Sequence, residues 1–384
     1  MKARKFLVYL LCINAVLLQF GAGASADSAL PGMPKVLDAN NIYAADSSNN
    51  LSDVVKNFPA YIYVPNTHAG TVNVIDQKTH KIIATHKVGR EPQHVVPSWD
   101  LKTLWVNSDK GNSLTPIDPA TGKFGKPVFV EDPYNLYFTP DGKYAVVMSN
   151  AKQQIVFRDP HSMKVIKRLS VPCPGINHAD WSADGRTFVA SCEFSGAILL
   201  VDTSKMIVLK TQKLPTKYAS QTTSSHYGMK NMGPQPQDVK LSPDGKTYYI
   251  ADMMSDGVWT MKAPWGKVSY LKTGLGAHGL YVTRDAKEML ITNRDEGSIS
   301  VFSFVQNKLI AKWKISGGGS PDMGGISADG KIFWISGRYD NAIYAISTAD
   351  GKLIDKIKVG AGPHGLCVYP QPGRYSLGHT GVFR

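Results

Sequence analysis

Short runs of alternating hydrophobic and polar residues recur from residue 61 to residue 369. Each run spans roughly four to eight residues and ends at a cluster of Gly, Pro, Asn or Asp. This is the pattern of a half-buried β-strand followed by a turn. The first three runs cover residues 61–64, 71–75 and 82–88. The pattern predicts an all-β protein built from short strands.

The strands belong to a longer repeat. Seven times after Arg90, a Pro or Gly, often followed by His or Asp, precedes a hydrophobic strand and, typically, a Ser/Thr-x-Asp-Gly turn. A period of about 40–45 residues with four strands per unit is typical of a propeller blade. The turn aspartates are separated by 41, 43, 60, 41 and 44 residues, and they are Asp100, Asp141, Asp184, Asp244, Asp285 and Asp329.

The two ends of the repeat complement each other. Residues 61–88 supply three strands with no strand before them, and residues 365–369 supply one strand with none after it. If the last strand becomes the innermost member of the first blade, the ring closes and no strand edge is left exposed. We therefore predict a seven-bladed β-propeller with four strands per blade over residues 60–370.

The segments outside the propeller have their own patterns. In residues 1–26, Lys2 and two further basic residues precede an apolar run, and small residues close the segment, which predicts a cleaved secretory signal. We expect a periplasmic or secreted protein with no transmembrane span after cleavage. Residues 27–59 are a polar lead-in that we expect to pack across the propeller, and residues 371–384 are a Gly/Pro-containing tail expected to plug the channel.

Composition narrows the choice of partners. Hydrophobic residues make up 43% and charged residues 19% of the 384 residues, as in a folded globular protein. The formal net charge is +13, but the lysines are dispersed without aromatic interleaving, so no specific nucleic-acid binding is expected. Outside the signal, Cys173, Cys192 and Cys367 form an odd set, so at least one thiol stays unpaired.

The repeat also predicts which residues share a face. Each inner strand begins on one face of the disc and ends at its turn on the other, and the loops between second and third strands return to the first face. Four of seven inner strands begin with a histidine. The residues expected at this channel mouth are His94, Asn135, His178, Asp238, His278, Asp322 and His364 from strand starts, and Cys192, Arg294 and Arg338 from loops.

An insertion lies on the same side. The spacing of 60 residues between Asp184 and Asp244 is longer than the others because it contains an insertion of nearly 20 residues, within 214–236, between an outer strand and the next inner strand. It contains His226, Met229 and Met232 in a His-x2-Met-x2-Met run. Imidazole with thioether is a ligand set that suits copper, especially the reduced ion.

The spacing of the strand-start histidines argues against one shared site. His94 and His178 lie six residues before their turn position, whereas His278 and His364 lie seven before theirs. A one-residue offset reverses the side-chain direction in a strand. We therefore expect two histidines with residues of the insertion, rather than all four histidines, to hold an ion. The alternative is that these polar residues simply line a wet channel.

The blade sequences resemble a known repeat. Residues 63–66, Tyr-Val-Pro-Asn, followed by Gly70-Thr71, resemble the YVTN repeat of exported prokaryotic propellers, and residues 249–252 and 290–293 repeat the pattern. The haem-binding domain of cytochrome-type nitrite reductases and the copper domain of nitrous oxide reductase are similar in architecture, with histidines at a channel mouth. This chain lacks the full seven-histidine set and a Cys-x-x-Cys-His sequence, so the resemblance leaves copper or a non-covalent tetrapyrrole open.

These observations lead to three functional hypotheses. The first is an exported propeller, expected as a monomer, that binds a small ligand or a metal, in its sharpest form copper, at the histidine-bearing mouth. The second is a non-catalytic scaffold for an envelope protein. The third is a lactonase-like hydrolase, by resemblance to seven-bladed lactonases, with Glu193, Asp238, Arg294 and Arg338 as candidates. The predicted metal ligands are His94, His178, His278, His364, His226, Met229 and Met232.

Overall fold

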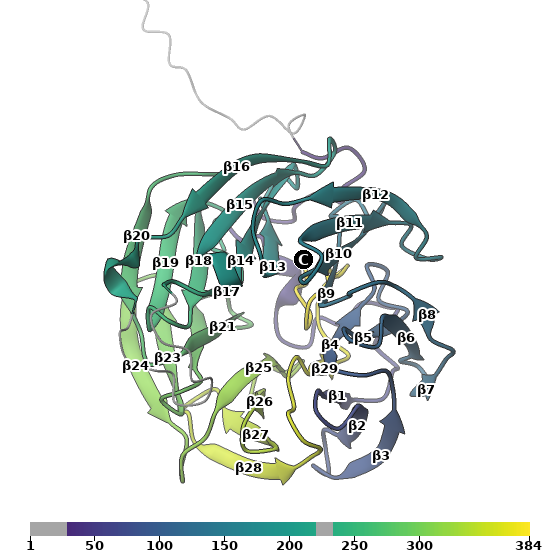
Figure 1. The fold of residues 1–384 in the computed structure, drawn as a ribbon. Helices are drawn as coiled ribbons and strands as arrows, with labels where there is room; N and C mark the ends of the chain where they lie inside the picture. The colour runs from purple at the N-terminus through teal and green to yellow at the C-terminus, as the bar shows by residue number, and fades with distance from the viewer. Residues whose placement is uncertain (1–28, 220–232) are drawn as a thin grey trace, which may run out of the picture.

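A computed structural model describes residues 29–219 and 233–384. They form seven antiparallel sheets arranged as blades around a central channel (Figure 1). The prediction of seven blades with four strand positions each is confirmed, and in one blade the outermost position is split between two short strands.

The first four blades run as follows. The first contains β29 (Cys367–Tyr369), β1 (Tyr61–Asn66), β2 (Thr71–Asp76) and β3 (Ile82–Lys87). The second contains β4 (Pro92–Pro97), β5 (Leu104–Ser108), β6 (Ser113–Asp118), β7 (Lys123–Phe124) and β8 (Val128–Phe129). The third contains β9 (Asn135–Phe138), β10 (Ala145–Ser149), β11 (Gln154–Arg158) and β12 (Val165–Ser170). The fourth contains β13 (Ile176–Trp181), β14 (Thr187–Cys192), β15 (Ala197–Asp202) and β16 (Ile207–Lys213).

The last three blades and the short helices complete the fold. The fifth contains β17 (Pro236–Leu241), β18 (Thr247–Asp252), β19 (Gly257–Lys262) and β20 (Val268–Lys272). The sixth contains β21 (Ala277–Val282), β22 (Glu288–Asn293), β23 (Ser298–Ser303) and β24 (Lys308–Lys314). The seventh contains β25 (Pro321–Ile326), β26 (Ile332–Gly337), β27 (Ala342–Ser347) and β28 (Leu353–Lys358). Three 3₁₀ turns are η2 (Ala44–Asp46), η3 (Glu193–Ser195) and η4 (Thr216–Tyr218).

The ring closes between the two ends of the repeat. Strand β29 pairs antiparallel with β1, with Tyr369 opposite Tyr61 and Cys367 opposite Tyr63. The last strand is therefore the innermost strand of the first blade, as the sequence predicts. Closure matters because an unpaired inner edge of β1 would expose backbone donors and acceptors.

Burial decreases from the channel outward. Inner strand β4 is buried at all six residues, whereas outer strand β3 alternates between more and less exposed positions. The core lies between neighbouring blades, where bulky side chains such as Tyr137, Trp181 and Phe188 are almost completely buried. Inner strands are therefore buried throughout although they carry polar residues, as in the sequence Pro-Gln-His-Val-Val-Pro of β4.

The repeated Ser/Thr-x-Asp-Gly sequence forms the turn after each of several inner strands. In the fourth blade the Ser182 hydroxyl donates to Asp184 at 2.5 Å, and Gly185 adopts a φ of 70° that favours glycine. The disc thus has a turn face, where these turns lie, and a histidine face, where the inner strands begin.

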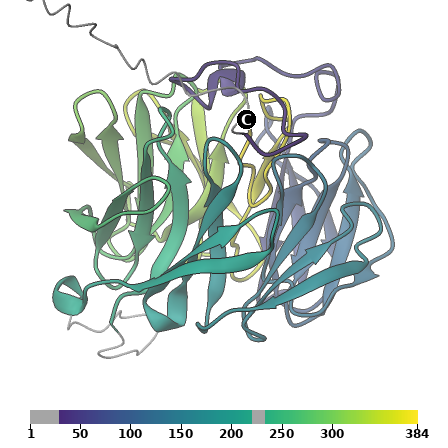
Figure 2. The ribbon, with the colours of Figure 1, turned by 90° about the horizontal axis from the view of Figure 1, so that it is seen from above.

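The lead-in lies over the turn face (Figure 2). Its backbone NH groups donate to the turns of the fourth, fifth and seventh blades: Leu30 to the Asp184 carbonyl, Ile42 to the Pro243 carbonyl and Asn49 to the Ala328 carbonyl, at 2.7–2.8 Å. The segment is thus tied to three blades, more tightly than the absence of a sequence period suggested.

The C-terminal segment turns into the channel (Figure 1, yellow). Residues 373–384, here called the C-terminal hairpin, fold back on themselves, because the Leu377 NH donates to the Val382 carbonyl at 2.7 Å. The Leu377 carbonyl accepts from the Phe138 NH at 2.9 Å, and the His379 NH donates to the Leu136 carbonyl at 2.8 Å. The hairpin therefore packs against β9, inside the ring.

Two of the three cysteines outside the predicted signal form a disulfide and the third is free, as expected from their odd number. Cys173 and Cys192 form a disulfide that joins the loop before β13 to the end of β14. Within the described residues, Cys367 is the free cysteine, and it is buried. The same residues contain no helix that is long and apolar enough to cross a membrane.

Candidate metal centre

The four strand-start histidines converge in the channel. Ring centroids are 5.0 Å apart for His94 and His364, 5.8 Å for His94 and His178, 6.3 Å for His178 and His278, and 6.1 Å for His278 and His364. All four residues are at most 2% exposed. The expectation that the spacing offset would turn some of them away from the others is therefore wrong.

The physical reason is a bulge at the start of the inner strands. In β13 and β14, Ile176 faces Cys192 but Ala179 faces Ala190, so the inner strand holds one extra residue. Inner strands β4, β17, β21 and β25 shift register in the same region. A bulge re-aims the neighbouring side chain, so a one-residue offset in the sequence does not reverse the histidines.

A fifth histidine comes from the C-terminal hairpin. The His379 ring centroid lies 4.9 Å from that of His178 and 5.3 Å from that of His94, and the ring stacks on Tyr137 at 5.9 Å. Sequence reasoning treated this segment only as a plug and missed the residue. The available signal was a histidine between two glycines, Gly378 and Gly381, in a turn. We call these five residues the histidine cluster.

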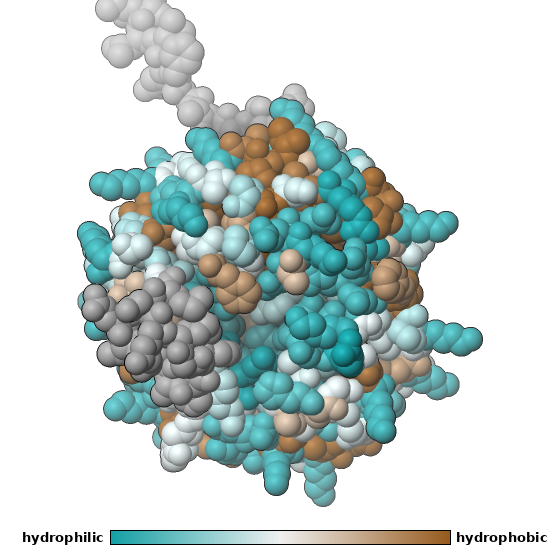
Figure 3. Space-filling view, viewed as in Figure 1, coloured by the Kyte–Doolittle hydropathy of each residue, from teal (hydrophilic) through white to brown (hydrophobic). Residues whose placement is uncertain are grey.

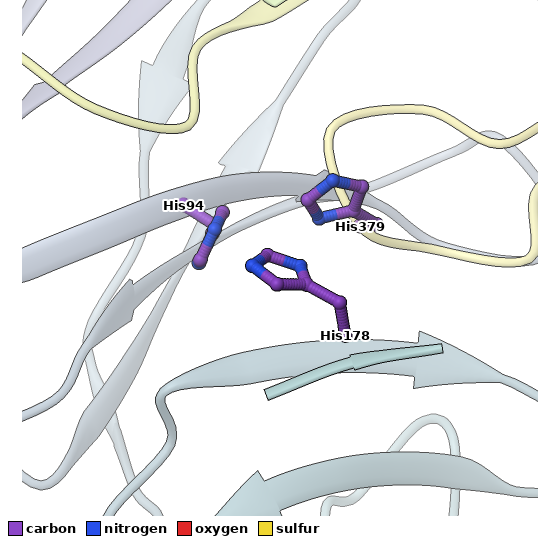
Figure 4. Close-up of side chains that lie close together, drawn as sticks. All are labelled: His94, His178 and His379. Carbon is purple, nitrogen blue, oxygen red and sulfur yellow. The ribbon is translucent and has the colours of Figure 1, made fainter. Parts of the chain in front are cut away.

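Three members of the cluster have metal-like spacing. His94, His178 and His379 each offer a ring nitrogen, and the three nitrogens lie within 4.8 Å of one another (Figure 4). Nitrogens bound at about 2.0–2.1 Å to one ion are about 3–4 Å apart. Small rotations of the three imidazoles would bring them to that separation.

The hydrogen bonds of two rings leave a lone pair for a ligand. His94 Nδ1 lies 2.9 Å from the Tyr134 carbonyl oxygen, which can only accept, so Nδ1 carries the proton and Nε2 does not. His364 Nδ1 lies 2.6 Å from the Asp322 carboxylate, which also only accepts, so here too Nδ1 carries the proton and Nε2 does not. Metal-binding histidines are commonly oriented by such an acceptor on the other ring nitrogen.

Asn135 controls the other two rings. Its Nδ2 lies 3.2 Å from His178 Nδ1 and 3.0 Å from His379 Nδ1. With the amide nitrogen toward the rings, both protons lie on Nε2. The Oδ1 atom of Asn135 accepts from the Leu136 NH at 2.9 Å, which holds the amide nitrogen toward the rings. Asn135 is thus a shared hydrogen-bond partner that selects the tautomers of two predicted or potential ligands.

The Nε2 atoms are buried without hydrogen-bond partners. This holds for His94, His178, His364 and His379 against the part of the chain that the structure describes. Most buried polar atoms in proteins have a partner, and an exception calls for an explanation such as an ion. Four such atoms lie together in the histidine cluster.

Asp322 is the main charge beside the cluster. Its carboxylate contacts Arg294 at 2.5 and 2.9 Å, His364 at 2.6 Å and His278 at 3.3 Å. Burial on its own would raise the pKa of Asp322, but Arg294 and the two imidazoles outweigh it and hold the pKa well below its usual range. Asp322 is therefore an ionised anchor for two of the imidazoles.

The imidazoles themselves are neutral at pH 7. Burial lowers the pKa of His178 to about 3 and that of His364 to about 4, and it holds the pKa values of His94, His278 and His379 well below the usual range. The neutral imidazole is the form that binds metal ions. In this arrangement His178 and His379 still carry a proton on Nε2, because Asn135 Nδ2 faces the Nδ1 atom of both rings.

The remaining predicted mouth residues have other positions. Asp238 accepts from the Leu280 NH at 3.0 Å and lies 3.8 Å from His379 Nε2, and burial raises its pKa to about 6. Arg338 lies at the rim and donates to Thr67 Oγ1 at 2.8 Å. Cys192, which was predicted to lie at the mouth, forms the disulfide with Cys173. The residues His226, Met229 and Met232 lie outside the described residues.

The histidine face is mostly polar around its centre. Figure 3 shows hydrophilic side chains around a hollow at the middle of this face. The lead-in and the C-terminus lie over the opposite face (Figure 2). The cluster thus lies below a polar mouth, with the C-terminal hairpin entering from the other side.

Comparison with solved structures finds the same fold in proteins with different roles. Hydrazine synthase of Kuenenia stuttgartiensis matches with a TM-score of 0.61 at 18% identity, over 78% of this chain and 98% of that one. Dihydro-heme d1 dehydrogenase NirN matches with a TM-score of 0.59 at 13% identity, over 88% of this chain and 82% of that one. A 6-phosphogluconolactonase candidate from Bacteroides uniformis matches with a TM-score of 0.60 at 16% identity, over 81% of this chain and 100% of that one. At these identities the likeness establishes the fold alone.

Sequence comparison gives the family. A search among curated proteins finds no match. The family model described as YNCE-like beta-propeller matches residues 45–372, which include all seven blades and end just before the C-terminal hairpin. The chain therefore belongs to the YNCE-like beta-propeller family.

Proposed function

We propose that this propeller binds one transition-metal ion through His94, His178 and His379. The observation that carries the proposal is the approach of three buried ring nitrogens to within 4.8 Å of one another. The ligands come from the second blade, the fourth blade and the C-terminal hairpin. His364, whose ring lies 5.0 Å from that of His94, is a candidate fourth ligand.

The chemistry of the cluster favours a metal over a merely polar channel lining. Residues that line open water keep exposed polar atoms, whereas these histidines are at most 2% exposed and four Nε2 atoms have no partner among the described residues. A buried polar atom left without a partner costs about 1–3 kcal/mol. A bound ion would satisfy several of these atoms at once.

Copper is the first ion to test. Imidazole ligands suit copper, zinc, iron and nickel, so the donor set alone selects a class of ions. The thioethers that would favour reduced copper, Met229 and Met232, lie outside the described residues. Export to an oxidising compartment, predicted from residues 1–26, is part of the same proposal.

Metal titration of the full mature chain tests the proposal. We expect one Cu(II) or Zn(II) per chain, and we expect His94→Ala, His178→Ala and His379→Ala each to weaken binding by at least about 100-fold. Loss of a residue that only supports a ligand already costs about 10- to 100-fold. His161→Ala, an exposed histidine in the turn between β11 and β12, is the matched control. Absence of stoichiometric binding, or equal binding by all four variants, would contradict the proposal.

A second candidate function, hydrolysis of a lactone, is favoured by one observation. His364 is oriented by the Asp322 carboxylate at 2.6 Å and has a buried Nε2, which is the arrangement of a general base. Metal-free protein that hydrolyses simple lactones, and loses the activity in His364→Ala, would support it. Equal lactone hydrolysis by wild type and His364→Ala would reject it.

A further inference from the structure

The C-terminal hairpin delivers His379 to the cluster from the turn face. The chain leaves β29 at Tyr369, runs beside the lead-in at Gly373, turns at residues 378–381 and returns to Arg384. Its two arms are joined by a bridge between Ser376 and Phe383 and by the hydrogen bond from Leu377 to Val382. His379 thus lies at the tip and Arg384 at the end of the return arm.

A buried ion pair holds the end of this hairpin. Arg384 Nη2 donates to Asp180 Oδ1 at 2.8 Å and to Oδ2 at 3.1 Å, and the two residues are 7% and 1% exposed. The guanidinium also lies over the Tyr43 ring of the lead-in, 4.4 Å from its centroid. One guanidinium nitrogen thus reaches both carboxylate oxygens, and a charge-assisted hydrogen bond of this kind is stronger than a neutral one.

The partner of Arg384 lies on the strand that carries a proposed ligand. Asp180 and His178 are two residues apart in β13, and both are buried. Alternate residues of a strand point to the same side, although the bulge before Ala179 modifies the spacing here. The hairpin therefore meets β13 at two points, His379 against His178 and Arg384 against Asp180.

These two contacts set the separation of two ligands. Only four residues lie between His379 and Arg384, and the hairpin bridge restrains them. Movement at Arg384 would therefore be transmitted to the tip. The family model ends at residue 372, so both residues belong to a segment beyond the matched propeller.

We propose that Arg384 is a positioning residue that holds His379 at the metal centre through its ion pair with Asp180. This inference rests on the proposed function. It adds that the site is completed by docking of the C-terminal hairpin rather than by the blades alone. Arg384 does not touch the ion in this account.

Copper binding by variants of the hairpin tests the proposal. Arg384→Gln should weaken Cu(II) binding by about 10- to 100-fold and reduce the number of coordinating nitrogens in the electron paramagnetic resonance spectrum, as His379→Ala does. Arg384→Lys should restore part of the affinity and of the three-nitrogen signal. Arg374→Gln is the matched control, because this arginine of the same hairpin is exposed and donates to the Lys35 carbonyl at 2.8 Å.

A double variant separates positioning from folding. Arg384→Gln combined with Asp180→Asn leaves no unpaired buried charge, so it should fold while still losing the anchor. Reduced nitrogen count in this folded double variant supports the proposal. Unchanged affinity and an unchanged three-nitrogen spectrum in both variants would overturn it. If wild type itself binds no ion, the proposed function fails and this inference fails with it.

Discussion

Asp322 shows how a single buried charge can organise several side chains. It is fully buried between blades six and seven and is shared by Arg294, His278 and His364. Such a group stabilises the fold only while its partners remain, because an unpaired buried charge is costly. The same residue orients the imidazole of His364, so stability and site geometry are coupled here.

We predict that Asp322→Asn destabilises the protein by about 3–5 kcal/mol, because it removes the charge of a carboxylate that is buried against Arg294 at 2.5 Å. Urea unfolding of the metal-free protein measures the change. Asp53→Asn, which removes an exposed pair with Lys56, is the control and should have no measurable effect. A similar small change in both variants would contradict the role assigned to Asp322.

Asp46 in the lead-in should make the stability of the folded protein depend on pH. Burial raises its pKa to about 6, against the attraction of Arg284, Arg384 and Lys240. Between about pH 4 and pH 6 the folded protein holds a proton that the unfolded chain has released. This contribution to stability is present at low pH and is lost as the pH rises through about 6.

Replacement of Asp46 should therefore act only at the higher pH. Asp46→Asn is expected to be more stable than wild type by up to about 3 kcal/mol at pH 8 and similar to it at pH 4. Thermal unfolding at the two pH values measures the difference, with Asp38→Asn, an exposed acid of the same segment, as the control. A difference that is independent of pH would refute the assignment.

At the scale of the elements, the strands were predictable because their signal is local. The alternation that begins at Thr187 and Thr247 matches β14 and β18, which start at these residues. The bulges that aim the histidines were not predictable, because they depend on pairing between β13 and β14 and not on either sequence alone. The ion pair that holds the C-terminal hairpin was not predictable for the same reason, since Arg384 and Asp180 are 204 residues apart.

Removal of the disulfide should lower the stability of the protein without affecting metal binding. Cys173 and Cys192 close a loop with a sequence separation of 19 residues, for which the loss of unfolded-state entropy corresponds to about 3 kcal/mol. The double variant Cys173→Ser with Cys192→Ser should lose about that much stability by urea unfolding. It should still bind one ion, because neither sulfur is a ligand in our account. Loss of metal binding without loss of stability would contradict this division.

The whole molecule determines the site, because its proposed ligands lie far apart in the sequence. Ring closure by β29 brings the first blade beside the last, and the lead-in lies over the turn face (Figure 2). The C-terminal hairpin packs against β9 and β13 inside the ring. The sequence predicted the number of blades and the face, since both follow from the repeat. It could not predict the distances across the channel, which depend on the packing of all seven blades.

Metal binding should therefore stabilise the whole propeller. An ion that binds only the folded chain adds about 2.7 kcal/mol at a free concentration of 100 times its Kd. We expect Cu(II) to raise the Tm of wild type and of His161→Ala, but not that of His379→Ala. Chelation should reverse the shift. Equal shifts in all three proteins would indicate binding elsewhere.

X-ray absorption spectroscopy of the copper-loaded full chain tests the central claim most directly. The account predicts at least three imidazole nitrogens at about 2.0 Å from one ion, and one fewer in His379→Ala. A spectrum with fewer than three imidazoles, or one that His379→Ala leaves unchanged, would contradict a metal centre built from the blades and the C-terminal hairpin.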